Sequence, residues 1–216
     1  MRLLVSGCTT TTKRLMGERP DRLGVLLTPG NGNREWWGPG TVWACDNDCF
    51  GGLNVTAYLR MLAKVVAYKT RPAWIAVPDA VGDSAETLRR FDRWEPMLTE
   101  IGLPVALVSQ DGLNAPPWER FKCLFVGGTD AWKLSDASLQ LTLEAHQRGK
   151  LVHVGRVNTL RRLTFLGRAI RDGRAWCDTV DGTGFSRFGD KRIAPGIRWI
   201  DLSLADRQQV MFGGTA

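Results

Sequence analysis

The stretch that decides the fold is residues 105–130, VALVSQDGLNAPPWERFKCLFVGGTD. It holds two short apolar runs, Val105–Val108 and Cys123–Val126, and polar or glycine residues follow each run at once. A short run that is apolar throughout, without alternation, is typical of a strand buried on both faces of a parallel sheet. The segment therefore predicts two buried parallel strands that carry polar groups at their carboxyl ends.

The same unit recurs along the chain. Helical patterns separate the later apolar runs, over Asn54–Thr70, from Asp83 to near Gly102, over Ser135–Arg148 and over Thr159–Arg171. Alternation of about eight strands with helices predicts an α/β fold, a compact (β/α)8 TIM-type barrel. The six further runs of strand length are Leu3–Ser6, Val25–Leu27, Val42–Cys45, Trp74–Val77, Leu151–Val154 and Trp176–Val180.

The early part of the chain departs from this regularity. The first three predicted strands leave too little room for full helices between them, so we expect this part to be irregular or partly antiparallel. An open, doubly wound sheet is the alternative, although no GxGxxG turn follows any strand. We expect residues 1–216 to form a single barrel domain.

Composition indicates a globular protein of a reducing compartment. The chain is 44% hydrophobic and 24% charged, and no apolar run approaches the roughly 20 residues that span a bilayer. The five cysteines include no CxxC pair, which argues against a disulfide framework and a structural zinc site. The two histidines have no metal-ligand spacing, so we expect no metal. From the apolar runs we expect no membrane partner, and from the cysteines we expect a cytoplasmic location.

Positive charge is concentrated near the carboxyl-terminal end of the sequence. The net charge is +7, and residues 156–198 alone hold ten basic and four acidic residues. Such a cluster is typical of a surface that binds a polyanion, although a solvated helix face is the alternative. The residues that we expect to contact nucleic acid are Arg161, Arg162, Arg187, Lys191 and Arg192.

Polar groups follow six of the predicted strands. In a barrel they would meet at the carboxyl-end face, where barrel active sites lie, although loop starters and helix caps are the alternative. Two carboxylates in one pocket suit displacement at an anomeric carbon, and an amide beside exposed glycine backbone suits hydrogen bonding to a flat heterocycle. The candidate residues are Asp46, Asp79, Gln110, Gly127, Gly128, Gly155, Arg156, Asp178 and Asp181.

Taken in chain order, these residues resemble the tRNA-guanine transglycosylase superfamily, which exchanges guanine for a 7-deazaguanine within nucleic acid. The segment Asp46–Gly51 takes the place of the family's DSGG(F/Y)Q and keeps its aspartate and aromatic residue. Asp79 resembles the family's base-binding aspartate, and Gln110 resembles the glutamine of its VQG segment. The resemblance implies that Asp46 handles protons and that Asp79 and Gln110 bind the base.

The later motifs extend the resemblance to about Arg187. Gly127–Gly128 resembles the family's double glycine, which binds the base through its backbone, and Val154–Arg156 resembles its GVG segment. The family's nucleophile is the second aspartate of a D-x-x-D pattern at the end of a strand. Asp178 and Asp181 have that spacing, which implies Asp181 as nucleophile, with Asp178 as the alternative.

Departures from the family pattern guide the expected substrate. The family's CxCxxC…H zinc site is missing, the chain is much shorter than the tRNA enzymes, and Asp48 and Cys49 replace the DSGG glycines. The first two departures fit the compact phage-type branch that inserts 7-deazaguanines into DNA. The resemblance therefore implies DNA as the partner, RNA as second choice, a free 7-deazaguanine as co-substrate, and the host cytoplasm if the gene is a phage gene.

The implied activity is that of a pentosyltransferase working by double displacement through a glycosyl-enzyme. It needs no cofactor, because one glycosidic bond replaces another. The tRNA enzymes dimerise through the region missing here, so a monomer is implied. The alternatives are the same exchange on tRNA, a hydrolase of nucleosides or glycosidic bonds, and a non-catalytic nucleic-acid-binding barrel.

Overall fold

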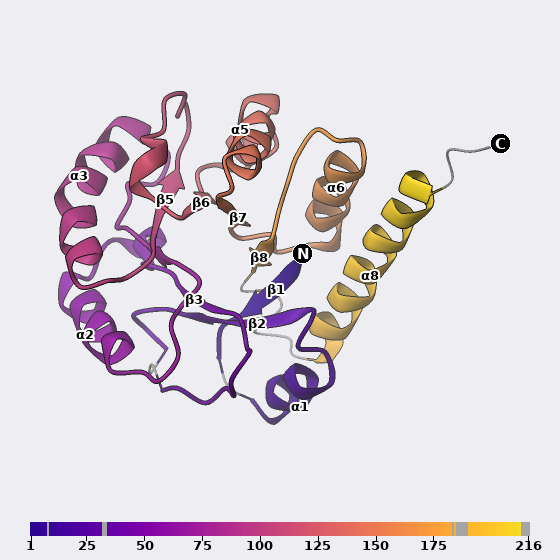
Figure 1. The fold of residues 1–216 in the computed structure, drawn as a ribbon, viewed down its shortest axis with the longest axis horizontal. Helices are drawn as coiled ribbons and strands as arrows, with labels where there is room; N and C mark the ends of the chain where they lie inside the picture. Colours follow the sequence, from indigo (N-terminus) through magenta and orange to yellow (C-terminus); the bar gives the residue numbers. More distant parts are fainter. Residues whose placement is uncertain (8, 32–33, 183, 185–189, 213–216) are drawn as a thin grey trace.

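Eight parallel strands form a closed barrel in the computed structural model, which describes residues 1–7, 9–31, 34–182, 184 and 190–212 (Figure 1). Neighbours in sequence are neighbours in the barrel, and β8 closes it by pairing with β1. The predicted (β/α)8 TIM-type barrel is confirmed, and the open sheet is excluded. The strands are β1 (Arg2–Val5), β2 (Leu23–Leu27), β3 (Trp43–Cys45), β4 (Ile75–Ala76), β5 (Val105–Ser109), β6 (Cys123–Val126), β7 (Leu151–Val154) and β8 (Thr179–Asp181).

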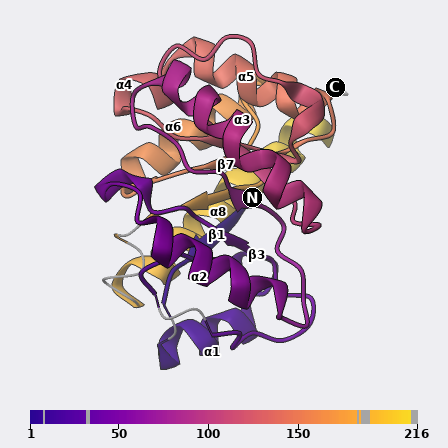
Figure 2. The same cartoon turned by 90° about the vertical axis from the view of Figure 1, so that its left-hand side faces the viewer.

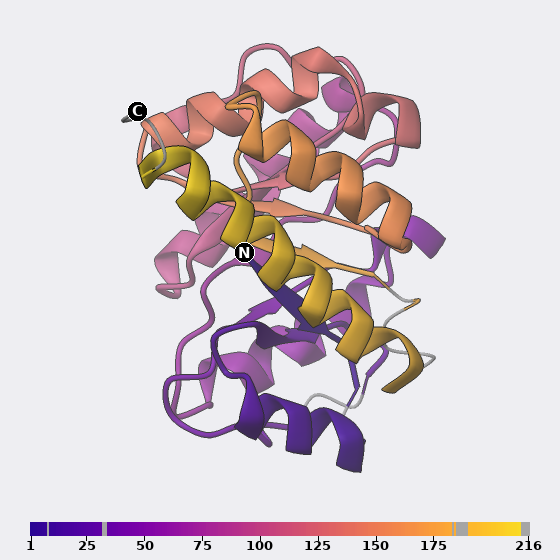
Figure 3. The same ribbon diagram turned by 90° about the vertical axis from the view of Figure 1, so that its right-hand side faces the viewer.

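Helices surround the barrel, and those before α8 begin where the sequence offers a cap. Side chains of Asn54, Asp83, Thr129, Ser135 and Thr159 accept hydrogen bonds from backbone N–H groups in the first turns of their helices. Figure 2 shows α2 and α3 along one side of the barrel, and Figure 3 shows α8 running beside α6 on the other. The helices are α1 (Thr10–Glu18), α2 (Val55–Val66), α3 (Ser84–Glu100), α4 (Asp130–Lys133), α5 (Asp136–Gln147), α6 (Leu160–Arg171) and α8 (Asp190–Phe212).

The expectation of antiparallel pairing near the amino terminus is wrong. β1 pairs with β2, and β2 with β3, in parallel registers. The nine residues of α1 make a helix about 14 Å long. That length matches the span of about 13 Å expected for the four-residue β1, so a short strand needs only a short return helix. The irregularity lies instead in the connection from β2 to β3, whose described residues form no helix.

The Trp36–Trp37 segment lies in that connection. The Trp37 ring packs against Trp43, with 4.9 Å between ring centroids, and its Nε1 donates to Thr70 Oγ1 at 3.3 Å. Thr70 precedes β4, so this tryptophan packs near the amino-terminal side of the barrel.

The barrel interior is filled by aromatic rings beneath the carboxyl end. His153 is fully buried between Trp74 and Phe125, with ring centroids 4.6 and 4.5 Å apart. Small residues such as Ala44, Ala76 and Ala106 line the same interior and leave room for these rings. These packed rings fill the barrel interior, so any ligand site must lie beyond them, at the carboxyl ends of the strands.

The described cysteines are buried and form no disulfide; they are Cys45, Cys49, Cys123 and Cys177. Cys8 lies outside the described residues. None of the described helices is both long and apolar enough to cross a bilayer.

Candidate active site

A pocket at the carboxyl end of the barrel gathers most of the predicted site residues. Its open volume is about 60 Å³, which is small beside the roughly 300–1,000 Å³ of typical ligand sites. The lining comes from the ends of β3, β4, β5, β6, β7 and β8 and the loops that follow them. The predicted residues among it are Asp46, Asp79, Gln110, Gly127, Gly128, Gly155, Arg156 and Asp181.

Asp46 follows β3 directly and has the chemistry of a neutral-pH proton donor. Burial raises the pKa of its carboxyl to about 7, and the negative charge of Asp181 adds to the rise. One carboxylate oxygen accepts a hydrogen bond from Asn47 N at 2.8 Å, which opposes the rise without cancelling it. A carboxyl with this pKa is partly protonated at pH 7 and can both give and take a proton.

Asp181 ends β8 and is held on one oxygen only. Its Oδ1 accepts a hydrogen bond from Arg156 N at 2.6 Å, and His153 Nε2 lies 3.3 Å from the same oxygen. The other ring nitrogen of His153, Nδ1, lies 2.9 Å from Thr179 Oγ1, which fixes the ring. No described residue donates a hydrogen bond to Oδ2 of Asp181, so this oxygen is open to react toward the pocket.

His153 lies within an otherwise apolar strand, and the structure shows that it faces the Asp181 carboxylate. Its Nε2 is buried and lacks a hydrogen bond of good geometry among the described residues. The available signal was a histidine inside an otherwise apolar strand, on the neighbour of the strand that ends in Asp181. The spacing between them in the sequence gave no hint of the contact.

Asp79, Asn47 and Gln110 form a hydrogen-bonded group on the opposite wall. Asn47 Nδ2 donates to Asp79 Oδ1 at 2.8 Å, and Gln110 Nε2 donates to Asp79 Oδ2. Gln110 Oε1 in turn accepts from Gly82 N at 2.8 Å. Burial raises the pKa of the Asp79 carboxyl, and hydrogen bonds from Asn47 and Cys49 counter the rise. Asp79 and Gln110 are therefore paired with each other in this state and must exchange partners to bind a ligand.

The glycines of the pocket have a reason that differs from the predicted one. A Cβ on Gly127 would lie 2.7 Å from Val108 and 2.8 Å from Gln110 Nε2, and one on Gly155 would collide with the Phe125 ring. Gly128 has a φ of +76°, a conformation that disfavours side chains. Gly127 and Gly155 are required because neighbouring side chains fill the space, and Gly128 is required by its backbone conformation. None of these reasons depends on binding of a base.

Lys133 is a pocket residue that the sequence analysis missed. It ends the four-residue helix α4, is 8% exposed, and makes no hydrogen bond through its ammonium group to the described residues. Burial, with a smaller contribution from Arg156, lowers the pKa of the ammonium to about 8. Its signal was weak, because a lysine in a polar stretch after a strand is usually solvated.

Phe50 and Arg156 meet across the mouth of the pocket. The Arg156 guanidinium lies 3.6 Å from the centroid of the Phe50 ring, which is itself 64% exposed. Phe50 follows β3 and Arg156 follows β7, four strands away around the barrel. This cation–π contact lies across the mouth of a pocket that has room for about two water molecules, so a larger ligand requires the ring and the guanidinium to separate.

Asp178 does not belong to the site, contrary to the prediction. Its Oδ2 accepts a hydrogen bond from Val152 N at 2.8 Å, and its Oδ1 accepts one from Trp176 Nε1 at 3.0 Å. Asp178 comes just before β8 and Asp181 ends it, so a spacing of three residues spans the strand, about 10 Å. The geometry removes Asp178 as the alternative nucleophile and as a substrate-binding residue.

Four of the five predicted nucleic-acid contacts lie among the described residues, on α6 and α8. Lys191 and Arg192 line a cavity of about 360 Å³ with Asn158 and Thr159, between the first turns of α6 and α8, which we call the α6–α8 groove. Arg161 is exposed on α6. Arg162 pairs with Asp130 and donates to the carbonyl of Arg156 at 3.2 Å, so it braces the site. Arg187 lies outside the described residues.

Comparison with known proteins places the fold. No protein-family profile and no curated protein sequence matches the chain. The structure is similar to the crystal structure of a citrate lyase from Burkholderia xenovorans LB400, with a TM-score of 0.52 and 12% sequence identity over 100% of this chain and 84% of that one. At this identity the likeness shows the fold alone.

Proposed function

We propose that this protein is a base-exchanging transglycosylase that replaces guanine in DNA with a 7-deazaguanine such as 7-cyano-7-deazaguanine. One observation carries the proposal: Asp46, with a pKa of about 7, and Asp181, with one carboxylate oxygen open, line the same pocket at the carboxyl end of the barrel. A proton donor and a nucleophilic carboxylate in one pocket are what double displacement at an anomeric carbon requires.

In the first displacement, Asp181 Oδ2 attacks C1′ of the target nucleotide. The bond from C1′ to the guanine nitrogen breaks, and the departing base takes a proton from Asp46. The Arg156 N–H holds the other oxygen of Asp181, and His153 Nε2 lies 3.3 Å from that oxygen, so the carboxylate stays oriented during attack. The product is a glycosyl ester on Asp181 and a free guanine.

In the second displacement, a 7-deazaguanine takes the place of guanine in the pocket. Asp46, now ionised, accepts the proton from the ring nitrogen of the incoming base as that nitrogen attacks C1′. The ester bond to Asp181 breaks and the carboxylate is restored. Two inversions retain the configuration at C1′, and the same carboxyl serves as acid and then base, as in retaining glycosidases.

Recognition of the base falls to the opposite wall. Asp79 and Gln110 present a carboxylate and an amide, and the backbone at Gly127–Gly128 presents further polar groups. When the Phe50–Arg156 contact opens, these groups can exchange their mutual hydrogen bonds for bonds to a guanine-like edge. The exchange costs little because each buried polar group keeps a partner.

Nucleic acid suits the surroundings of the pocket. The target base must leave its stack to reach Asp181, which costs a few kcal/mol, and phosphate contacts help to offset that cost. Lys191 and Arg192 in the α6–α8 groove are suited to such contacts, and the chain carries a net charge of +7. The choice of DNA over RNA follows the resemblance to the compact phage-type branch.

Incorporation is the direct test. The purified protein is incubated with DNA or tRNA and 7-cyano-7-deazaguanine, and the digested nucleosides are identified by mass, with Asp181→Ala and Asp46→Ala in parallel. Incorporation into DNA that disappears in both variants supports the proposal.

Three other results would contradict it in different ways. Incorporation into tRNA alone moves the substrate to RNA and keeps the chemistry. Abasic sites formed without any deazapurine indicate a hydrolase. No incorporation with several deazapurines, into either nucleic acid, overturns base exchange.

A further inference from the structure

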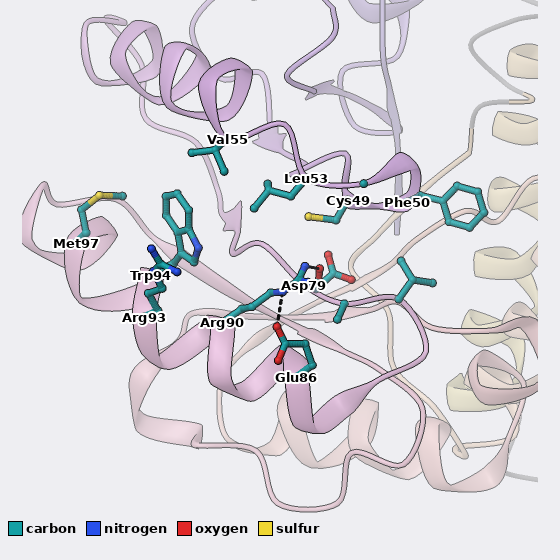
Figure 4. Close-up of a pocket in the computed structure, with 13 residues that line it drawn as sticks. Cys49, Phe50, Leu53, Val55, Asp79, Glu86, Arg90, Arg93, Trp94 and Met97 are labelled. Atoms are coloured by element: carbon teal, nitrogen blue, oxygen red, sulfur yellow. Dashed lines mark hydrogen bonds and ion pairs between the residues drawn. The ribbon is translucent and has the colours of Figure 1, made fainter.

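A larger hollow lies beside the pocket, between the segment after β3 and helix α3 (Figure 4). We call it the α2–α3 groove, and its volume is about 750 Å³. Cys49, Phe50, Asp79 and Val81 line both the pocket and this groove. The two spaces therefore adjoin, and whatever occupies the groove lies beside the ligand in the pocket.

One part of the groove offers a flat apolar slot. Figure 4 shows the Trp94 indole projecting from α3, with Leu53 and Val55 on the facing wall. The ring also contacts Tyr58 of α2 in a T-shaped arrangement, with centroids 5.6 Å apart and planes at 88°. Val55 is 43% exposed, which is a high fraction for an apolar side chain. A planar aromatic ligand fits between such walls.

Next to the slot lies an arginine without a partner. Arg93 is exposed in the groove and makes no hydrogen bond or ion pair with any described residue. Its neighbour Arg90 is held instead, because its Nε donates to Glu86 Oε1 at 2.9 Å and its Nη1 donates to the carbonyl of Asp79. The guanidinium of Arg93 is thus left to bind an anion, and phosphate suits its paired donors.

We infer that the α2–α3 groove binds the nucleotide next to the target, with its base against Trp94 and its phosphate at Arg93. This inference rests on the proposed function, because the groove adjoins the pocket that receives the target base. An aromatic face beside a free arginine is the pairing that single-stranded nucleic acid uses. A base in the slot has left its duplex, so the substrate is single-stranded or locally opened DNA.

The test measures binding of a fluorescein-labelled single-stranded oligodeoxynucleotide to the full chain by anisotropy. Trp94→Ala is expected to raise Kd about 10-fold through loss of base stacking, and Trp94→Phe to keep most of the affinity. Arg93→Gln is expected to weaken binding several-fold and to flatten its salt dependence. Arg89→Gln is the matched control, because it removes the same charge from α3, where Arg89 pairs with Glu86 and does not line the groove.

Kinetics of guanine exchange separate the two proposals. Trp94→Ala is expected to keep kcat, the rate at saturating DNA, and to raise KM for DNA, since Trp94 does not line the catalytic pocket. Equal Kd values in the wild type, Trp94→Ala and Arg93→Gln, with exchange intact, overturn the groove assignment and leave the exchange chemistry standing. A wild-type protein that neither binds DNA nor exchanges guanine overturns both.

Discussion

Two aspartates at the two ends of β8, Asp178 just before it and Asp181 as its last residue, lie at opposite ends of the barrel and have opposite characters. Asp181, at the carboxyl end of β8, has one oxygen open toward a pocket that also holds a carboxyl of raised pKa and an ammonium of lowered pKa. Asp178, at the amino end, gives both oxygens to hydrogen bonds from Val152 N and Trp176 Nε1. The carboxyl end carries groups that cost stability, and the amino end carries groups that contribute to it, as expected where barrels separate function from stability.

The largest predicted effect tests the contrast between Asp181 and Asp178. Asp181→Asn keeps the shape of the side chain and can still accept from Arg156 N, but it removes the nucleophile. We expect the exchange rate to fall by at least about 10³-fold with little change in unfolding temperature. Asp178→Asn can keep only one of two hydrogen bonds, so we expect it to lose about 1–2 kcal/mol of stability and to keep kcat/KM near wild type.

Exchange assays and thermal unfolding of the two variants provide the check. The reverse pattern, in which Asp178→Asn abolishes exchange in a stably folded protein while Asp181→Asn remains active, would contradict the assignment of the two ends. A loss of activity in both variants that tracks a loss of folded protein would show that β8 is only structural.

The carboxyl-end residues could be predicted because strand ends are local in sequence. Each apolar run marks a strand, and the residue that follows it, such as Asp46 or Gln110, must lie on the carboxyl-end face of a parallel barrel. Asp178 was misplaced because a D-x-x-D spacing does not say where the strand begins. His153 and Lys133 were missed because their roles arise from contacts between neighbouring strands and loops, which no local pattern encodes.

The missed helices have a similar explanation. Helix α1 opens with three threonines, which have low helix propensity, and it is held by burial of Leu15 and Met16 against the barrel. Helix α8 contains Pro195, which usually marks a boundary. Tertiary packing against α6 and β1 decides its position, and that packing is invisible in the sequence alone.

The second prediction sharpens the comparison through pH. Asp46 must be protonated when guanine leaves, so release of guanine in a single turnover is expected to decline as pH rises through about 7. Asp46→Asn is expected to lower the exchange rate by about 10²–10⁴-fold, because the amide cannot give or take the proton. Stopped time courses between pH 5.5 and 9 measure both effects.

The same carboxyl is expected to cost stability. Because the folded state raises its pKa, the folded protein binds this proton more tightly than the unfolded chain does. The cost is absent below about pH 4, grows as pH rises, and is complete above about pH 7. Asp46→Asn should therefore be more stable than wild type at pH 8, on the order of 2 kcal/mol after allowance for partial exposure, with no gain at pH 4. A variant that is less stable than wild type at pH 8 would contradict this account.

The smallest predicted effect concerns Lys133, the other strained charge of the carboxyl end. Its pKa is lowered to about 8, so the folded state binds the proton less tightly than the unfolded chain, and the cost is complete below about pH 8. Lys133→Met should stabilise the protein at pH 7 by about 1–3 kcal/mol, and the gain should shrink as pH rises toward 10. Denaturant titrations at pH 7 and 10 measure the difference, with the exposed Lys122→Met as a control expected to stay within about 0.5 kcal/mol. A gain that is equal at both pH values would show that packing of the methionine, and not removal of a buried charge, stabilises the variant. The carboxyl end of the barrel would then lose one of the two groups of shifted pKa that distinguish it from the amino end.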